Sequence, residues 1–293
     1  MTTTRPGTWR DLLLSVVAAM ALTACQPATA PSGGLPASDH VHALEVLDGG
    51  GLLLGLHGAL YRSEDGRNWQ VAGLEGQDAM SIGAVGDDAP LFVAGHDLLA
   101  RSLDGGKTFE PMQPADLPSL DIHAFAQSPA DPDVVYAFVV GSGIHTSADG
   151  GETWELRAPV GRAVGDDVVA LAVLPDDPGT VLVGGVQSGL FRSTDGARTF
   201  DRVLPQGVGS LATSTDAPDR VVALTARGIE ASADGGRTWT VVVAPTEAGV
   251  DGQPVVIATG DGDTAWLVTE RPRTLQRSQD GGRSWEEIAR AEP

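Results

Sequence analysis

Five of the six histidines are spaced so that a repeated β structure would bring their imidazoles together at one end. His57 and His96 each precede a Ser-X-Asp-Gly stretch by six residues, and His42 and His123 occupy matching places in the segments VHAL and IHAF. His40 lies two residues before His42, so on a strand both side chains point the same way. Three or four converging imidazoles suit Zn or Cu, which makes all five histidines candidate metal ligands. They could equally be separate polar caps on strand ends or pH-sensitive surface groups.

A second candidate group combines arginine with an acid near the C-terminus. Arg227 and Arg273 each stand five residues before a later Ser-X-Asp-Gly stretch, and Glu270 and Arg271 are beside the second of them. Guanidinium groups held in place could bind a ligand carboxylate. The alternative is a set of solvated turn arginines that offset an acidic surface, where exposed ion pairs contribute little.

The elements that would position these residues follow from a repeated turn. The stretch SADGGETW begins at Ser147, and related stretches begin at Ser63, Ser102, Ser193, Ser232 and Ser278. In each one the Asp can accept bonds from backbone N–H groups of the turn, while Gly supplies the positive φ that a tight turn needs. We therefore assign a structural role to Asp65, Asp104, Asp149, Asp195, Asp234 and Asp280.

Each interval between these turns contains four short β-rich runs, which predicts a propeller blade. In the first interval the runs are 41–46, 52–56, 59–62 and 68–72. Six turns predict an all-β domain over residues 40–293, a single six-bladed propeller of four-stranded antiparallel blades. The domain starts on an inner-strand pattern and ends on an outer one, so we expect whole blades without strand exchange. Strand parity places the Asp turns on one face and the candidate histidines and arginines on the other, which we call the top face.

The turn motif Ser-X-Asp-X-Gly-X-Thr-Trp resembles the Asp box, or BNR repeat, of sialidases, sortilin-type receptors and many bacterial surface propellers. The first copy is one residue short, and the fourth has Ala197 in place of the second Gly. The resemblance covers about residues 40–293 and implies a propeller whose Asp turns are structural and lie away from the ligand site. Together with the N-terminus described next, the HVHAL start also resembles bacterial lipoproteins that are labelled glycosyl-hydrolase-like.

The N-terminus has the pattern of a secretory signal. Arg5 and Arg10 precede a short apolar run over 12–24, which ends in Leu-Thr-Ala-Cys at Cys25. These four residues resemble the bacterial lipobox, which implies cleavage before Cys25 and lipidation of its thiol; the alternative is an ordinary signal peptide. Residues 1–25 are thus a predicted signal peptide, and residues 26–39, rich in Pro, Ala, Ser and Gly, a predicted flexible linker. We expect lipid anchoring on the extracytoplasmic face of a bacterial envelope.

The net charge of −20 limits the partners of this chain. An acidic surface of this kind repels nucleic acid, so we expect no nucleic-acid partner and a soluble monomeric domain. Cys25 is the single cysteine, which leaves none for a disulfide.

Two classes of function fit this inventory, and a third rests on resemblance. The first is recognition of a protein or carbohydrate ligand on the top face, around the histidines. The second is a glycoside hydrolase that uses two carboxylates of that face, for which the candidates are Asp39, Asp97, Asp121, Asp166, Asp167 and Glu270. A sialidase mechanism would also need a Tyr nucleophile, and only Tyr61 and Tyr136 are present, both in early strand patterns. The third class, which resembles the photosystem assembly propeller, is a scaffold for assembly.

Overall fold

In the described residues, the regular structure consists of β-strands and one short 3-10 helix (Asp48–Gly50). The computed structural model describes residues 1–2, 33–37, 39–86, 88–162, 164–243 and 250–292. It separates Met1–Ala30 from Pro31–Pro293 as two units, and nearly all described residues belong to the second. Cys25 and the predicted signal peptide beyond Thr2 lie outside the described residues. In the described part, no helix is long and apolar enough to cross a membrane.

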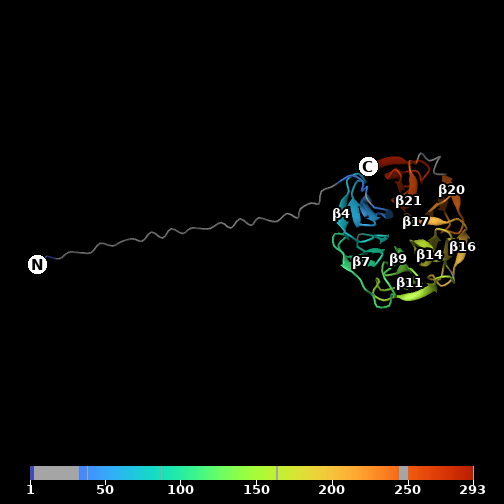
Figure 1. The fold of residues 1–293 in the computed structure, drawn as a ribbon, viewed down its shortest axis with the longest axis horizontal. Coiled ribbons are helices and arrows are strands. Elements are labelled where there is room, and N and C mark those ends of the chain that lie inside the picture. The colour runs from blue at the N-terminus through green and yellow to red at the C-terminus, as the bar shows by residue number, and fades with distance from the viewer. Residues whose placement is uncertain (3–32, 38, 87, 163, 244–249, 293) are drawn as a thin grey trace. The chain divides into compact units, whose positions relative to one another are not determined.

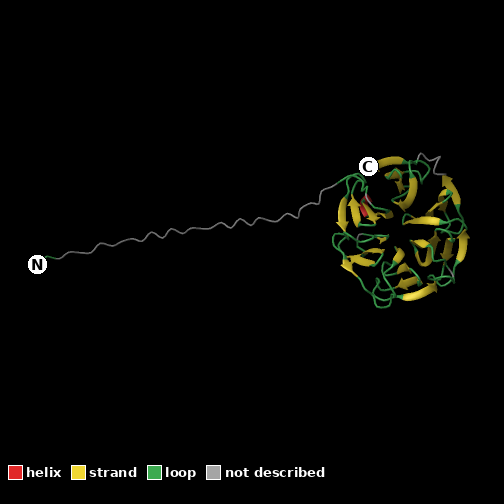
Figure 2. Cartoon of the chain, in the orientation of Figure 1, coloured by secondary structure: helices red, strands yellow, loops and turns green. Residues whose placement is uncertain are grey.

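The strands form six antiparallel sheets, each of four strands consecutive in the chain (Figures 1 and 2). Blade 1 consists of β1 (Val41–Val46), β2 (Leu52–Leu56), β3 (Ala59–Ser63) and β4 (Gln70–Gly73). Blade 2 consists of β5 (Ser81–Gly83), β6 (Leu91–Gly95), β7 (Leu98–Ser102) and β8 (Glu110–Pro111). Blade 3 consists of β9 (Ile122–Gln127), β10 (Val135–Val139), β11 (Gly143–Ser147) and β12 (Glu155–Pro159). Blade 4 consists of β13 (Val168–Leu174), β14 (Asp177–Gly185), β15 (Gly189–Ser193) and β16 (Asp201–Leu204). Blade 5 consists of β17 (Val208–Ser214), β18 (Ala217–Thr225), β19 (Gly228–Ser232) and β20 (Thr240–Val243). Blade 6 consists of β21 (Gln253–Thr259), β22 (Ala265–Glu270), β23 (Thr274–Ser278) and β24 (Glu286–Arg290).

The six blades close into a ring around a central axis (Figure 1). The first strand of each blade packs beside the first strand of the next, in the order β1, β5, β9, β13, β17, β21 and back to β1. The predicted all-β, six-bladed propeller is therefore confirmed, and so is the expectation that every blade is whole. Because no strand is exchanged between blades 6 and 1, these two blades are joined by contacts between their side chains.

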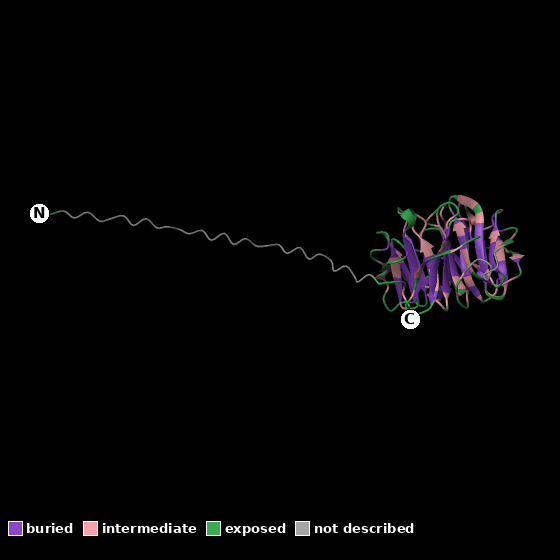
Figure 3. Cartoon of the chain, turned by 90° about the horizontal axis from the view of Figure 1, so that it is seen from above, coloured by how far each residue is buried: buried purple, intermediate pink, exposed green. Residues whose placement is uncertain are grey.

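The core is divided among the interfaces between blades. The described residues contain six apolar clusters, and each cluster combines side chains of two neighbouring blades. The middle strands are buried on both faces, as the purple strands of Figure 3 show, because each blade is covered by a neighbour on either side. In the sequence, a strand of a sheet that is buried on both faces is a continuous apolar run, such as Leu52–Leu56, and not an alternation of apolar and polar residues.

The Ser-X-Asp turns join the third and fourth strands of each blade, and their side chains satisfy the backbone. In the third turn, Gly151 N–H donates to Ser147 Oγ at 2.9 Å, and Thr153 N–H and Oγ1–H donate to the Asp149 carboxylate at 2.9 and 2.6 Å. Trp154 Nε1–H donates to the Gly151 carbonyl at 2.8 Å, so the indole is buried with its polar atom paired. In the fourth turn Ala197 takes a φ of 65° and keeps the equivalent bond to the Ser hydroxyl. L-residues rarely adopt this conformation, so glycine suits the other turns better.

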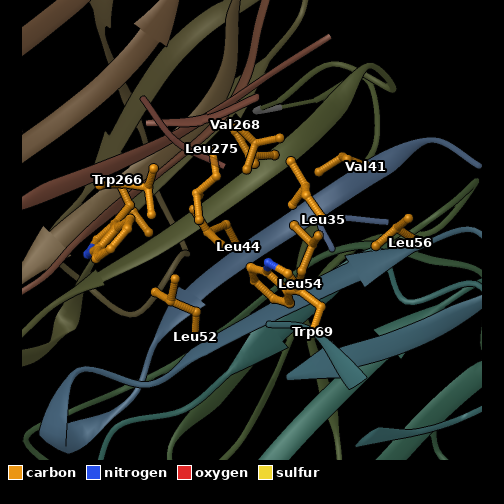
Figure 4. Packing of buried hydrophobic residues seen from close by; sticks show 13 residues of the cluster. Leu35, Val41, Leu44, Leu52, Leu54, Leu56, Trp69, Trp266, Val268 and Leu275 are labelled. Atoms are coloured by element: carbon orange, nitrogen blue, oxygen red, sulfur yellow. The ribbon is translucent and has the colours of Figure 1, made fainter. Parts of the chain in front are cut away.

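A segment ahead of blade 1 joins the two ends of the ring. Gly33 forms a β-bridge with Trp69, and Leu35, only 4% exposed, packs with Trp69 in the apolar cluster between blades 1 and 6 (Figure 4). Arg273, before β23 of blade 6, donates to the Pro36 carbonyl at 2.7 Å and to the Asp39 carbonyl. Residues 33–39 were predicted as part of the flexible linker, and those the structure describes pack on the propeller instead. The folded domain thus begins before His40.

Replacement of Arg273 by Ala tests this closure. The change leaves two backbone carbonyls and the Glu270 carboxylate without their common donor, so we expect a loss of about 2 kcal/mol in the free energy of unfolding. Arg227→Ala is the matched control, because Arg227 occupies the same repeat position but is half exposed and has only a 3.9 Å contact with Glu230. Equal denaturation midpoints for the two variants would show that Arg273 does not hold the ring closed.

The Ser-X-Asp turns make the free energy of unfolding depend on pH in the acidic range. Hydrogen bonds from Ser147, Thr153 and the backbone lower the pKa of Asp149 to about 2, from an unfolded value of about 3.9. The stabilisation is therefore present above about pH 4 and is lost as pH falls towards 2. We expect Asp149→Asn, which cannot titrate, to be less stable than the wild type at pH 6, with the difference shrinking progressively as pH falls from 4 to 2. Denaturant unfolding at pH 6, 4, 3 and 2 measures this, and a difference independent of pH would contradict it.

Candidate functional site

The top face of blades 1 to 3 gathers four histidines around two aspartates. His42 lies on β1 and His123 on β9, while His57 and His96 lie in the β2–β3 and β6–β7 turns. Two groups result. The first contains His42, His57 and Asp78, the second contains His96, Asp121 and His123, and within each group one ligand atom per residue lies within 4.8 Å of the others.

The backbone brings Asp78 between blades 1 and 2 through close contacts that need glycine. Asp78 precedes β5, and its neighbour Ala79 donates its N–H to the Leu56 carbonyl. A Cβ on Gly95 would lie 1.7 Å from the Asp78 carbonyl oxygen, and one on Gly55 would lie 2.3 Å from the Ala79 oxygen. These two glycines therefore allow the Asp78 segment to approach both turns that carry His57 and His96.

The repeat explains where Asp121 lies. The N–H of Val140 donates to the Asp121 carbonyl, as the N–H of His57 donates to His40 and that of Val186 to Asp167. His40, Asp121 and Asp167 thus occupy the same position ahead of their inner strands. At this position the Asp121 carboxylate turns towards His96 and His123, whereas His40 is exposed and belongs to neither group.

In the first group, Asp78 is the common partner of both histidines. His42 Nε2 lies 3.3 Å from Asp78 Oδ1, and His57 Nδ1 lies 3.0 Å from Asp78 Oδ2. Asp78 is buried, with a side chain 8% exposed, whereas the His57 side chain is 63% exposed. The group is therefore anchored in the protein at its carboxylate and open to solvent at His57.

In the second group, Asp121 has the corresponding role. His96 Nδ1 lies 2.9 Å from Asp121 Oδ1, and His123 Nε2 lies 3.3 Å from the same oxygen. The other nitrogen of His96, Nε2, lies 3.7 Å from Asp78 Oδ2. His96 therefore stands between the two carboxylates and links the groups.

Several of these polar atoms are buried without a hydrogen bond. They are His42 Nε2, Asp78 Oδ1, His123 Nε2 and Asp121 Oδ1. Each nitrogen is 3.3 Å from its oxygen, close enough to be an ion pair but not aligned for a hydrogen bond. An unpaired buried polar atom is costly, so the arrangement favours a further group that would bind both atoms at once.

Burial and neighbouring charges act in opposite directions on these imidazoles. Burial lowers the pKa of His42, as do the nearby His57, His40 and His96, while Asp78 raises it. The pKa of His123 is likewise lowered by burial and raised in part by Asp121. The net effect on both is a preference for the neutral imidazole, which is the form that binds metal ions.

The arginine group predicted on blades 5 and 6 is held in contacts within the fold. Arg273 is buried and donates to Glu270 at 2.7 Å, in addition to its bonds with the N-terminal segment. Arg227 faces Glu230 of its own blade at 3.9 Å. Arg271 is exposed and has a φ of 58°. Glu270 and Arg273 are therefore occupied by ring closure, and the ligand-binding role predicted for the group stays a prediction.

A cavity lies away from these residues, in the central channel. Its volume is about 400 Å³, and all six inner strands line it, while the six His and Asp residues do not. Glu45 of β1 faces this cavity and keeps some solvent contact, yet its carboxyl lies so deep that burial raises its pKa to about 8.

Glu45→Gln tests the environment of the channel. A carboxyl with a raised pKa stabilises the fold while it is protonated, and that contribution is lost as pH rises from about 4.5 through 8. We expect the variant to melt at a higher temperature than the wild type at pH 9 and at the same temperature at pH 4.5. Glu75→Gln, at an exposed position in the connection that follows β4, is the control. Equal effects of the two changes at pH 9 would contradict the prediction.

Sequence reasoning named four of the six residues in these groups as candidate metal ligands and did not name the other two in that role. Asp121 was predicted only as a carboxylate of the top face. Asp78 was not predicted at all, since it lies in a connection, GQDAM, with no recognisable counterpart in other blades. A search for acids near the expected end of each blade could have suggested it.

Comparison with known proteins identifies the fold and not the activity. No family model and no curated protein matches the sequence. A GH74 xyloglucanase from Xanthomonas campestris has a TM-score of 0.59 at 18% identity, with 88% of this chain and 47% of that chain covered. An extracellular domain assigned to a hybrid two-component system of B. thetaiotaomicron has a TM-score of 0.58 at 15% identity, over 87% and 36%. YCF48 from Cyanidioschyzon merolae has a TM-score of 0.54 at 16% identity, over 88% and 87%.

These neighbours share the propeller architecture with this chain. The chain spans about half the length of the xyloglucanase it matches and a smaller share of the two-component domain. At identities of 15–18% the likeness extends to the fold alone.

Proposed function

We propose that this chain is a lipid-anchored, extracytoplasmic Asp-box propeller that acts as a binding module, with a transition-metal centre on its top face. The observation that carries the proposal is the convergence of His42, His57, His96 and His123 on Asp78 and Asp121. The Ser-X-Asp turns lie at the other ends of the strands and are occupied by their own backbone bonds. We therefore place ligand binding on the top face, where the six His and Asp residues converge.

The donor set suits zinc or copper. Imidazole nitrogens combined with one or two carboxylate oxygens are the usual ligands of these ions in proteins. In a tetrahedral Zn site with bonds of about 2.0 Å, two ligand atoms lie about 3.3 Å apart. The separation between His42 Nε2 and Asp78 Oδ1 is 3.3 Å, and so is that between His123 Nε2 and Asp121 Oδ1. Within each of these two pairs, the orphaned atoms are thus spaced as two ligands of one ion.

Binding fits the site better than glycoside hydrolysis does. Of the candidate carboxylates, Asp121 faces two histidines, Glu270 is paired with Arg273, and Asp167 accepts the N–H groups of Gln187 and Ser188. The hydroxyl of Tyr136 donates to the Pro178 carbonyl, a contact between blades 3 and 4. Glu270, Asp167 and Tyr136 are thus engaged in contacts within the fold, and Asp121 belongs to the proposed metal centre, so we favour recognition of a protein or carbohydrate over catalysis.

The proposed location rests on the N-terminus. Cys25 would carry the lipid, and the residues up to Gly33 would span the distance from the membrane to the packed segment of the propeller. Propellers of this shape occur in extracellular domains of other bacterial proteins, which supports an extracytoplasmic site of action. The likeness to YCF48 keeps an assembly scaffold as a related form of the same binding role.

Metal analysis of the full chain purified without a His tag tests the metal centre. We expect bound Zn or Cu in the wild type and a loss of affinity of at least about tenfold in a His42→Ala/His123→Ala variant, which removes one ligand from each group. His40→Ala is the matched control, because His40 belongs to neither group. Equal, trace metal in the wild type and the double variant would refute the proposal.

A further inference from the structure

We infer that the top-face centre binds two divalent ions, one in each His/Asp group, and that the loaded pair binds an oxyanion of the phosphate type. This inference rests on the proposed metal centre. It names both the number of ions and the class of ligand that the ions would recruit.

Two ions follow from the division of the ligands into two sets. Each set offers two imidazoles and one carboxylate, and each contains one buried, unbonded N···O pair at 3.3 Å. A single ion would have to take both pairs, yet each pair converges on its own carboxylate. His96 lies between the two sets: its Nδ1 faces Asp121 of the second set, while its Nε2 faces Asp78 of the first set. The His96 imidazole can thus bind the ion of the second set through Nδ1 while its Nε2 remains close to the carboxylate of the first set.

The coordination of each set is incomplete. Three protein ligands around a tetrahedral ion leave one position open, as in catalytic and ligand-binding zinc sites. The exposed residues of the two sets are His57, with a side chain 63% exposed, and His96, with one 48% exposed, whereas Asp78 is buried beneath them. An additional ligand would therefore approach from solvent on the side of these two imidazoles.

The net charge of the metal-loaded groups indicates which class of additional ligand they would bind. A divalent ion with one carboxylate and two neutral imidazoles carries a net charge of about +1, so the loaded pair is cationic on a protein whose net charge is −20. Without the ions, the two carboxylates would repel an anion. Metal loading thus reverses the local charge and creates the one anion-attracting place that these six residues can form. A phosphate group can offer one oxygen to each ion, whereas a neutral sugar gains nothing from the positive charge.

The number of ions is measured first. The full, untagged chain is titrated with Zn²⁺ against a chromophoric chelator, and we expect two ions for the wild type and for the His40→Ala control. Asp78→Asn and Asp121→Asn should each retain one ion. Circular dichroism and melting temperature show whether the buried Asp78 variant is folded, and the half-exposed Asp121 provides an independent variant if it is not.

Ligand class is measured next, on zinc-loaded protein from which free metal has been removed. Calorimetric titration with inorganic phosphate should give one phosphate per two-ion protein, and acetate at the same concentration should bind at least about tenfold more weakly because it carries less charge. The metal-free wild type and the two Asp→Asn variants should show no phosphate binding or a markedly weaker signal.

The outcomes separate the two proposals. No zinc bound in the titration, together with no bound Zn or Cu in the metal analysis of the wild type, would refute the metal centre itself. One ion per chain would leave the metal centre standing and overturn the two-ion inference. Two ions without phosphate binding, or phosphate binding that is unchanged in the metal-free protein, would overturn the oxyanion part. Two ions in the wild type, one in each Asp→Asn variant and phosphate binding only with both ions present would support the inference in full.

Discussion

The structure depends on the need of every four-stranded blade to be covered on both faces. A twisted sheet with apolar side chains on either side is stable only between two neighbours, so six such sheets must close into a ring. Five of the six interfaces form between blades joined by the chain. The sixth, between blades 6 and 1, has no strand exchange to hold it and relies on the apolar cluster around Trp69 and Trp266 together with the segment at Leu35.

Closure of the ring occupies Arg273, a residue predicted from the sequence as part of a ligand-binding group. Arg227 and Arg273 hold the same place in the repeat, yet only the blade-6 residue meets a segment that needs donors for free carbonyls. The burial of Arg273 and its bond to Glu270 follow from its position at the seam of the ring. Equivalence in a repeat therefore predicts where a residue lies, while its role depends on what the neighbouring blade presents to it.

The same distinction explains what could be predicted from the sequence. The strands Val41–Val46, Leu52–Leu56 and Ile122–Gln127 were predicted with their observed bounds, because a repeated turn marks the end of each blade and apolar runs fill the interval. The equivalence of His42 and His123 was recognised for the same reason. Asp78 was missed since its contacts come from two turns of different blades, which no local pattern records. The packing of Leu35 was missed because a segment rich in Pro, Ala, Ser and Gly has the composition of a linker.

The chemistry of this propeller is found where its blades differ. The Ser-X-Asp turns are nearly identical in six blades and bond mainly to themselves, so they contribute geometry and acid-sensitive stability. At the opposite strand ends, the position that is exposed His40 in blade 1 is Asp121 in blade 3, and the turn histidines occur only in blades 1 and 2. Because neighbouring blades place their turns side by side, three unlike blades can bring four imidazoles and two carboxylates within reach of one another. A ring of repeats thus supplies a rigid frame, and a few differences between adjacent blades are sufficient to place an asymmetric cluster of imidazoles and carboxylates on it.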